Sequence, residues 1–400
     1  MPSKHKRITL LFNANKAYDR KIIAGVARYL QKGVDWDLYM EEDLITRLDR
    51  VNKWRGDGII ADFDNPKVVE FVQESHIAAV AVGGSYQDRQ QYPKQIPYVA
   101  TNNRTIARLG VEHFLSLGYQ NLAFYGIPSK PNNRWALERE RAFFEFVKRP
   151  SLLSIKTASK ASELNYFSFR GSLTHYRGWE RALEKLMAWL ERLPKPVAIM
   201  AATDVRARQV FEACHLLEYK IPDQVAILGV DDDEIISDLT GRSLSSVRQG
   251  TETMGYTAAG ILDRLVRGDR VAAKVHMVEP VGIVQSRSTD YMATTDPLVR
   301  AALDFIKQNA NQGIQATHVM KHLACSRTTI EQRFKKAINS TIHQEITKVQ
   351  LGQVKQLLLK TTLPLKEISE RCGYNTVQYM VMAFKKQLGI TPTEYRNQFN

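Results

Sequence analysis

The feature that most constrains this chain is an alternation, through its first two thirds, of short apolar runs with amphipathic helical segments. Such an alternation is typical of parallel β-sheets covered by helices, an α/β architecture. We predict strands at six runs, which are residues 8–12, 58–61, 78–82, 122–125, 197–201 and 225–230. We predict helices between them, including residues 20–32, 104–117, 179–191 and 205–217. Residues 149–178 are rich in Ser, Thr and Lys, and the pattern predicts no structure for them.

Several of the predicted strands end in polar or glycine residues. Asn13, Asp62, residues 83–85, Asp204 and Asp231 all stand at such ends. In open α/β sheets, ligands bind outside the carboxyl ends of the parallel strands. We therefore expect a ligand at this edge of the sheet.

The alternation stops near residue 287, and from residue 298 the sequence predicts helices only. We divide the chain into an α/β domain (1–287), a short polar linker (288–297) and an all-α domain (298–400). The net charge of the chain is +14, and residues 294–400 hold 15 Lys and Arg against 7 Asp and Glu. A basic balance concentrated in one region favours nucleic acid or another anionic partner.

Two helix pairs about fifty residues apart share one pattern in the all-α domain. In the first, Ile330 and Phe334 recur at helical spacing, and Ser326 stands at the N-cap position. In the second, Met380 and Phe384 take the equivalent places. Because a short helix and a tight turn precede each of these helices, the sequence predicts two helix-turn-helix units.

The face of each second helix that lies away from its apolar stripe is the candidate for reading bases. Amide and carboxylate side chains bond to base edges, and Thr, Val or Met contact a thymine methyl group. Lys and Arg beside them hold phosphates, which positions a domain without reading sequence. The alternative is a helical domain with a solvated basic face. The predicted DNA-contacting residues are Arg327, Thr328, Glu331, Gln332, Lys335, Lys336, Thr376, Gln378, Val381, Met382, Lys385 and Lys386, with Arg333 and Arg396 as further phosphate candidates.

Residues 373–396, GYNTVQYMVMAFKKQLGITPTEYR, resemble the signature of the AraC/XylS family of transcription regulators. The resemblance covers about the last 107 residues and implies a double helix-turn-helix domain that binds operator DNA. Met380 stands where the family usually has an aromatic residue, and Gln350 stands where a basic residue is common. Gly352 interrupts the helix expected between the two units, at a cost of about 1 kcal/mol relative to Ala.

Three segments of the α/β domain are similar to the effector-binding core of the LacI/GalR family and its periplasmic sugar-binding relatives. They are RLGVEHFLSLGYQNLAFYG (108–126), AATDVRARQVFEACHLLEYKIPDQVAILGVDDDE (201–234) and SLSSVRQGTETMGYTAAGILDRL (243–265). The resemblance implies a two-lobed, periplasmic-binding-protein-like domain that clamps a sugar. That family carries its DNA-binding helices in front of the core, whereas here the AraC-type domain follows it.

This order of domains, with the segments ITLLFNANKAYDR and GDGIIADFD, resembles the bacterial regulators of xylose operons. The resemblance implies D-xylose as effector, a homodimer, RNA polymerase as a partner, and activation of genes for xylose catabolism and transport. The alternative is a regulator of the same architecture that responds to another sugar or that represses.

A pentose pocket needs planar amide, carboxylate and guanidinium groups for the hydroxyls and an aromatic wall for the C–H face. Arg139 matches an arginine that reaches the ligand in the LacI/GalR family, although Ala142 replaces a glycine of the motif. The alternatives are that Asp204 and Asp231 only cap helices, that Trp135 is an ordinary core residue and that Gly84 only forms a turn. The predicted sugar-contacting residues are Asn13, Asn15, Tyr18, Asp19, Gly84, Trp135, Arg139, Asp204, Asp231 and Gln249.

Other functions are disfavoured by what the sequence lacks. Cys214, Cys325 and Cys372 do not have the spacing of a disulfide framework or a zinc site, which fits a reducing compartment. No run is long and apolar enough for a secretory signal or a membrane span, so we expect a cytoplasmic protein. Because no phosphate loop, zincin or serine-hydrolase motif occurs, we expect neither an enzyme nor a metal or other cofactor.

Overall fold

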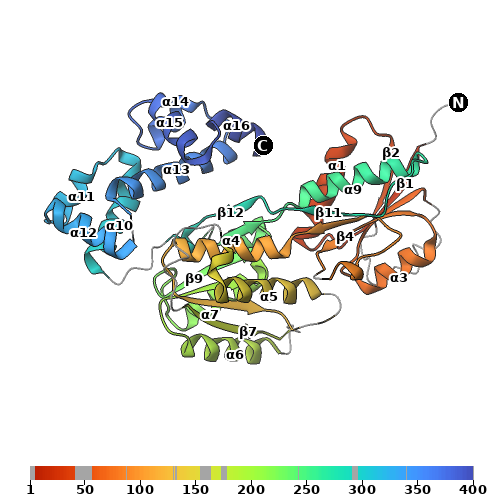
Figure 1. Ribbon diagram of the computed structural model, residues 1–400, viewed down its shortest axis with the longest axis horizontal. Helices are drawn as coiled ribbons and strands as arrows, with labels where there is room; N and C mark the ends of the chain where they lie inside the picture. Colours follow the sequence, from red (N-terminus) through yellow and green to blue (C-terminus); the bar gives the residue numbers. More distant parts are fainter. Residues whose placement is uncertain are drawn as a thin grey trace. The chain divides into compact units, whose positions relative to one another are not determined.

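The computed structural model describes residues 5–40, 56–86, 88–128, 130, 133–153, 164–172, 178–241, 243–290, 296–338 and 340–399. The chain divides into two compact units, Met1–Tyr291 and Met292–Asn400 (Figure 1). No helix among the described residues combines the length and the apolar character that crossing a membrane requires.

The first unit is built on two six-stranded sheets, which define its first and second lobes. The first-lobe strands are β1 (Lys6–Leu11), β2 (Trp36–Met40), β3 (Gly58–Asp62), β4 (Ala78–Gly84), β5 (Tyr98–Thr101) and β11 (Val275–Val278), in the order β11-β5-β4-β3-β1-β2. The second-lobe strands are β6 (Asn121–Gly126), β7 (Asn165–Arg170), β8 (Val197–Ala201), β9 (Val225–Val230), β10 (Ser245–Arg248) and β12 (Gly282–Val284), in the order β12-β10-β9-β8-β6-β7. Among the described residues, every strand pair is parallel except β10 with β12.

Helices cover both faces of each sheet, as a parallel sheet requires. Those of the first lobe are α1 (Ala17–Leu30), α3 (Pro66–Ser75) and α9 (Thr251–Val266). Those of the second lobe are α4 (Asn103–Ser116), α5 (Arg134–Lys148), α6 (Trp179–Arg192), α7 (Asp204–Leu216) and α8 (Glu234–Leu239). In Figure 1, α4 and α5 lie together on one face of the second-lobe sheet, and α6 and α7 lie on the other.

The six predicted strands and the four predicted helices are confirmed, with ends shifted by a few residues. They are the most apolar segments: every residue of β9, for example, is buried. The sequence pattern missed β2, β5, β7, β10, β11 and β12, which are short or lie partly exposed. The strand β7, with the sequence NYFSFR, lies inside the stretch 149–178 for which no structure was predicted.

Helix α9 returns to the first lobe from far along the sequence and packs against α1 (Figure 1). Two glycines make this crossing very close. A Cβ atom on Gly25 would lie 2.0 Å from the carbonyl oxygen of Glu252, and one on Gly255 would lie 1.9 Å from that of Ile22. Because α9 and β11 belong to the first lobe, the chain passes between the lobes three times: after β5, after β10 and between β11 and β12.

The segment expected to be a linker, 288–297, begins inside the second lobe. Ser288 and Thr289 end a short 3-10 helix (Arg287–Thr289) and are fully buried. The Ser288 hydroxyl donates to the carbonyl of Ile227 at 2.5 Å and accepts the N–H of Ser245 at 2.8 Å. Residues 291–295 lie outside the described residues, and the next helix begins at Pro297.

The second unit is helical. Its α-helices are α10 (Pro297–Asn309), α11 (Ala316–His322), α12 (Arg327–Ile338), α13 (Ile342–Lys360), α14 (Leu365–Arg371), α15 (Val377–Leu388) and α16 (Pro392–Phe399). One apolar core includes Ile330 and Phe334, and a second includes Met380 and Phe384. The connecting helix α13 contributes to both, so the unit has two small cores joined by one long helix.

Gln350, in the middle of α13, joins the two halves of this unit. It is buried, and its Nε2 donates to the carbonyl of Ala310 at 3.0 Å and to that of Gly373 at 3.1 Å. Gly373 forms the turn of the second helix-turn-helix, with φ +73°. A long basic side chain in place of Gln350 could not make this neutral bridge in the same buried position.

Candidate functional site

The first lobe carries a buried acidic side chain beside the carboxyl end of β1. The Oδ2 atom of Asp19 accepts the N–H of Asn13 at 2.7 Å, and Asp19 is 0% exposed. Burial, followed by the charge of Asp62, raises the pKa of Asp19 to about 7, against the opposing effect of Lys16. The Oδ1 atom of Asp19 has no hydrogen-bond partner within the described part of the chain. This carboxyl group therefore titrates near neutral pH and has one oxygen left for a ligand hydroxyl.

A series of polar contacts leads from the first lobe to the second. The hydroxyl of Tyr18 lies 3.5 Å from Oγ1 of Thr101, which lies 3.3 Å from Oε1 of Gln249. The Nε2 atom of Gln249 donates to Oδ1 of Asp231 at 2.5 Å. Burial raises the pKa of Asp231 to about 6, although Arg139 opposes the shift. The structure thus brings together three of the predicted sugar residues, Tyr18, Gln249 and Asp231.

Asp231 also has an unusual backbone, with φ +115°. An L side chain in this region stores roughly 1–3 kcal/mol of strain and persists only where the surroundings hold it. Such strain is found disproportionately at ligand sites, which agrees with the position of Asp231 at the end of β9.

Arg139 is 2% exposed and is held by partners of its own lobe. Its Nη2 donates to Oδ1 of Asn103 at 2.9 Å, and its Nη1 donates to the carbonyl of Ala202. Burial lowers the pKa of Arg139, and the largest opposing effect comes from Asp231. The guanidinium group lies 5.0 Å from the ring of Trp135. A fixed cation, a carboxylate and an indole therefore lie close together in the second lobe.

Asp204, by contrast, has both carboxylate oxygens bonded within the second lobe. Its Oδ1 accepts from the Ser246 hydroxyl at 2.6 Å, and its Oδ2 accepts the N–H of Asp233 at 2.7 Å. A Cβ atom on Gly229 would lie 2.0 Å from Oδ1, so the carboxylate packs directly on the sheet. Asp204 thus fixes the loop that carries Asp231.

Two other predicted residues, Gly84 and Asn15, have structural contacts of their own. A Cβ atom on Gly84 would lie 2.7 Å from Cβ of Trp135, so only glycine permits this approach of α5 to β4. The N–H of Asn15 donates to Oδ1 of Asn13 at 3.0 Å in an exposed turn. Asn15 is therefore exposed next to Asn13, and its N–H is already bonded within the turn.

Arg134, which the sequence pattern did not single out, connects the lobes from the start of α5. Its Nη2 lies 2.7 Å from Oδ1 of Asp64, and its guanidinium donates to the carbonyls of Gly84 and Ser85 at 3.0–3.1 Å and to the hydroxyl of Tyr98 at 3.0 Å. We call these contacts the Arg134 latch. Burial raises the pKa of Asp64 to about 6, and Arg134 opposes the shift. The sequence pattern could not reveal this role of Arg134, because the role depends on which residues of the other lobe lie beside it.

Basic residues of α1 make a second contact between the lobes. The Nζ atom of Lys21 donates to the carbonyl oxygens of Asp231 and Asp232 at 2.8 and 2.6 Å. Nη2 of Arg20 lies 3.6 Å from Oδ1 of Asp233. The loop after β9 is therefore held from the first lobe as well as by Asp204.

The second unit presents two matched helices, α12 and α15. The Ser326 hydroxyl accepts the N–H of Thr329 at 3.2 Å, and the Thr376 hydroxyl accepts the N–H of Tyr379 at the same distance. Each helix therefore begins with an equivalent cap. Both expose the faces that the sequence assigned to DNA contact. The exposed predicted residues are Arg327, Thr328, Glu331, Gln332, Lys335, Lys336, Thr376, Gln378, Met382, Lys385 and Lys386.

Three of the predicted DNA-contacting residues have partners within the second unit. Val381 is partly buried against the second apolar core, because it lies beside Phe384 on the helix. Arg333 makes an ion pair with Asp296 at 3.2 Å. Arg396 is partly buried and donates to the carbonyl of Leu363 at 2.6 Å, which ties α16 to the segment before α14. Tyr379, which the sequence pattern did not single out, is 44% exposed on the same helix.

Among the described residues, no cluster of three or more His, Cys, Asp or Glu side chains has the geometry to hold a metal ion.

Known protein families match segments of both units. The model of the XylR N-terminal domain matches residues 7–104, that of a periplasmic binding protein-like domain matches 111–289, and that of a helix-turn-helix domain matches 319–398. The xylose operon regulatory protein of Haemophilus influenzae is 38% identical over 99% of both chains. The chain belongs to the family of xylose operon regulatory proteins. The Escherichia coli K12 member is also 38% identical, over 99% of this chain and 98% of its own.

Solved structures support the assignment to this family. A structure described as the xylose-binding transcription activator xylR is 37% identical, covers 99% of both chains and has a TM-score of 0.65. A LacI-type protein of Alkaliphilus metalliredigens, solved with D-xylulofuranose, covers 71% of this chain at 18% identity and a TM-score of 0.53, which indicates a shared fold alone. The predicted fold class, a two-lobed core followed by a helix-turn-helix domain, is confirmed. Members of the family are transcription regulators and not enzymes.

Proposed function

We propose that this protein is a cytoplasmic transcription activator that binds D-xylose between its two lobes and operator DNA through α12 and α15. The observation that carries the sugar site is that Gln249 and Arg139 both act on Asp231 at the end of β9, and that Tyr18 of the first lobe reaches Gln249 through Thr101. Hydroxyl groups both donate and accept, so a pentose suits this mixture of carboxyl, amide and guanidinium groups. The relatives carry xylose in their names, which supports this sugar over other pentoses.

In this proposal Asp19, Asn13, Asp231 and Arg139 bond the sugar hydroxyls, and Tyr18 or Trp135 covers a C–H face. Asp204 does not contact the sugar, because both of its carboxylate oxygens are already bonded; instead it positions the loop after β9. The effector is then the only small molecule that the protein requires. A response to another sugar, or repression, is the alternative.

Calorimetry across pentoses tests the sugar site. Asp231→Asn keeps the size of the side chain but removes its charge, and a hydrogen bond to a charged group is worth about 1.5–3 kcal/mol. We expect xylose affinity to fall about 10- to 150-fold. Asp269→Asn, at an exposed carboxylate paired with Arg264, is the matched control. Equal affinity of the two variants would contradict the assignment of Asp231.

We further propose a homodimer that contacts RNA polymerase at the promoter. Each chain offers two recognition helices, which fit successive major grooves about 34 Å apart, so two chains read two half-sites. Sedimentation at micromolar concentration should give a dimer with xylose and DNA. A monomer under all conditions would contradict this proposal.

The sugar and the recognition helices belong to different units, so xylose must favour one arrangement of the lobes and, through residues 288–297, of the DNA-binding units. Inserting Gly and Ser residues between Asp290 and Asp296 should abolish the xylose dependence of DNA binding and leave both binding activities intact. A full response in the lengthened protein would exclude this route.

A further inference from the structure

The recognition helices α12 and α15 have the same length, equivalent N-terminal caps and an apolar stripe in the same position. Ile330 and Phe334 are fully buried in the first core, and Met380 and Phe384 are fully buried in the second. With equal lengths and equal caps, the two helices can be compared residue by residue at a spacing of fifty. Where the exposed side chains of the two helices differ, we expect the helices to contact different groups on DNA.

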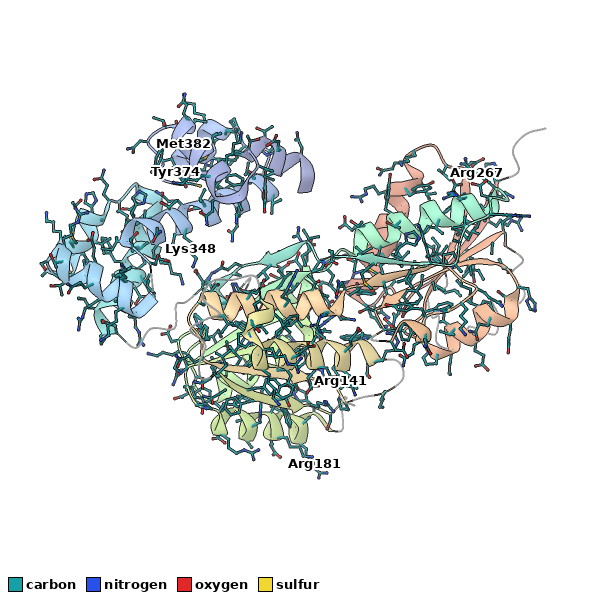
Figure 2. The ribbon with its side chains drawn as sticks, in the orientation of Figure 1. Arg141, Arg181, Arg267, Lys348, Tyr374 and Met382 are labelled. Carbon is teal, nitrogen blue, oxygen red and sulfur yellow. The ribbon has the colours of Figure 1, made fainter. Side chains whose placement is uncertain are left out.

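The two exposed faces differ at their centres. At 100° per residue, position 332 of α12 and position 382 of α15 lie opposite their apolar stripes, with positions 329 and 379 beside them. The first helix has Gln332 and Thr329 there, whereas the second has Met382 and Tyr379. Met382, labelled in Figure 2, is 61% exposed, and Tyr379 is 44% exposed.

Exposed Met and Tyr side chains at the centre of a basic helix face need a partner that is apolar at the centre and anionic at the rim. Lys385 and Lys386 follow on the same helix and are both exposed. The major groove meets this requirement where it presents thymine, because the C5-methyl group projects from the groove floor between two phosphate backbones. The ring of Tyr379 packs against that of Tyr374, with the two ring centroids 6.0 Å apart.

We infer that the centres of the two recognition helices read DNA by different chemistry: Gln332 at the centre of α12 reads a hydrogen-bonding base edge, and Met382 with Tyr379 at the centre of α15 reads thymine methyl groups. The inference rests on the proposed DNA-binding function and adds the base class that each helix selects. Each half-site then has one part that is recognised by hydrogen bonds and another that is recognised by its thymine methyl groups. The protein therefore binds each half-site in one orientation only.

Replacing thymine with deoxyuridine tests this inference, since deoxyuridine pairs identically but lacks the methyl group. The full-length protein first selects its sites from a random DNA pool in the presence of xylose. Each thymine of a selected half-site is then replaced singly, and affinity is measured by fluorescence anisotropy. We expect one or two replacements to weaken binding about fourfold each, the value for removing one buried methyl group from an apolar contact.

Variants assign these positions to a helix. Met382→Gln gives α15 the central residue of α12 and should remove the methyl sensitivity, whereas Gln332→Met should create a new sensitivity about one helical turn of DNA away. Both side chains are exposed, so neither variant should change the melting temperature. Tyr379→Thr tests the second side chain in the same way.

The outcomes separate the inference from the function on which it rests. Failure to select any DNA would refute the DNA-binding function itself. Specific binding that tolerates every deoxyuridine, or a methyl sensitivity that survives in Met382→Gln, would overturn the inference and keep the function. Normal DNA binding by Met382→Gln with reduced transcription would instead assign this face to a protein partner, and would also overturn it.

Discussion

Replacing Arg134 with methionine removes the Arg134 latch and should weaken xylose binding in a pH-dependent manner. Removing one partner of a buried ion pair costs about 3–5 kcal/mol when the remaining charge stays buried. The side chains of Arg134 and Asp64 are 23% and 10% exposed, so solvent screens this pair little. Asp64 escapes part of the cost by binding a proton, because its pKa is about 6 even with Arg134 beside it. We therefore expect a net cost of about 2 kcal/mol at neutral pH.

This cost falls on the arrangement in which the lobes meet, because separation would let water reach Asp64. If xylose binds that arrangement, its apparent Kd rises as the competent fraction falls, by up to about 30-fold for 2 kcal/mol. The effect should be small at pH 6, where Asp64 is easily protonated, and larger at pH 8, where it is ionised.

The assay is calorimetric titration with xylose at pH 6 and pH 8. Lys148→Met is the matched control, since it removes one charge from the same helix and its ammonium lies over the ring of Phe144 on that helix. Affinities that agree within twofold at pH 8 would refute the role of the latch. An equal loss at both pH values would refute the part assigned to Asp64.

Three further predictions concern stability. The parent should lose stability as pH rises from about 4 to about 7, because the raised pKa of Asp19 favours the folded state only while this carboxyl is protonated. Asp19→Asn does not titrate, so the difference in unfolding free energy between variant and parent should move in favour of the variant over this range. A difference that does not depend on pH, measured by chemical denaturation, would contradict this. Gln350→Ala should destabilise the second unit by about 2 kcal/mol in denaturant melts, since two carbonyls lose a buried donor, and a neutral effect would show that water replaces it. Gly352→Ala should stabilise that unit by about 1 kcal/mol, because no atom lies within 4 Å of the added methyl group, and a lower melting temperature would contradict this.

The sequence predicted the parts of the fold that hydrophobicity alone determines. Strands such as Val225–Val230 are apolar throughout and buried on both faces, so their pattern has one interpretation. The edge strand Asn165–Arg170 is half exposed and mixes polar with aromatic residues, as a loop can also do. Strand order and the return of α9 to the first lobe depend on contacts between residues far apart in the sequence. A local sequence pattern cannot predict such contacts.

The same limit explains the candidate site. Strand-end position identified Asp204 and Asp231 equally, but only the structure distinguishes the carboxylate bonded to Ser246 from the one beside Arg139. The Arg134 latch was missed because Asp64 and Arg134 are seventy residues apart, and the segment GDGIIADFD, which ends at Asp64, does not indicate a partner for it. In α15, residue 381 lies only 60° around the helix from Phe384, which explains why Val381 is partly buried against the apolar core while Tyr379 is exposed.

The most direct test of the account is whether xylose and operator DNA strengthen each other's binding equally. Operator affinity is measured with and without saturating xylose, and xylose affinity with and without saturating operator. The account predicts that both ratios exceed one and agree, at about 5- to 150-fold, because coupling between two binding sites is reciprocal. Tight binding of both ligands with ratios of one would contradict the central claim that this protein transmits the presence of xylose to DNA.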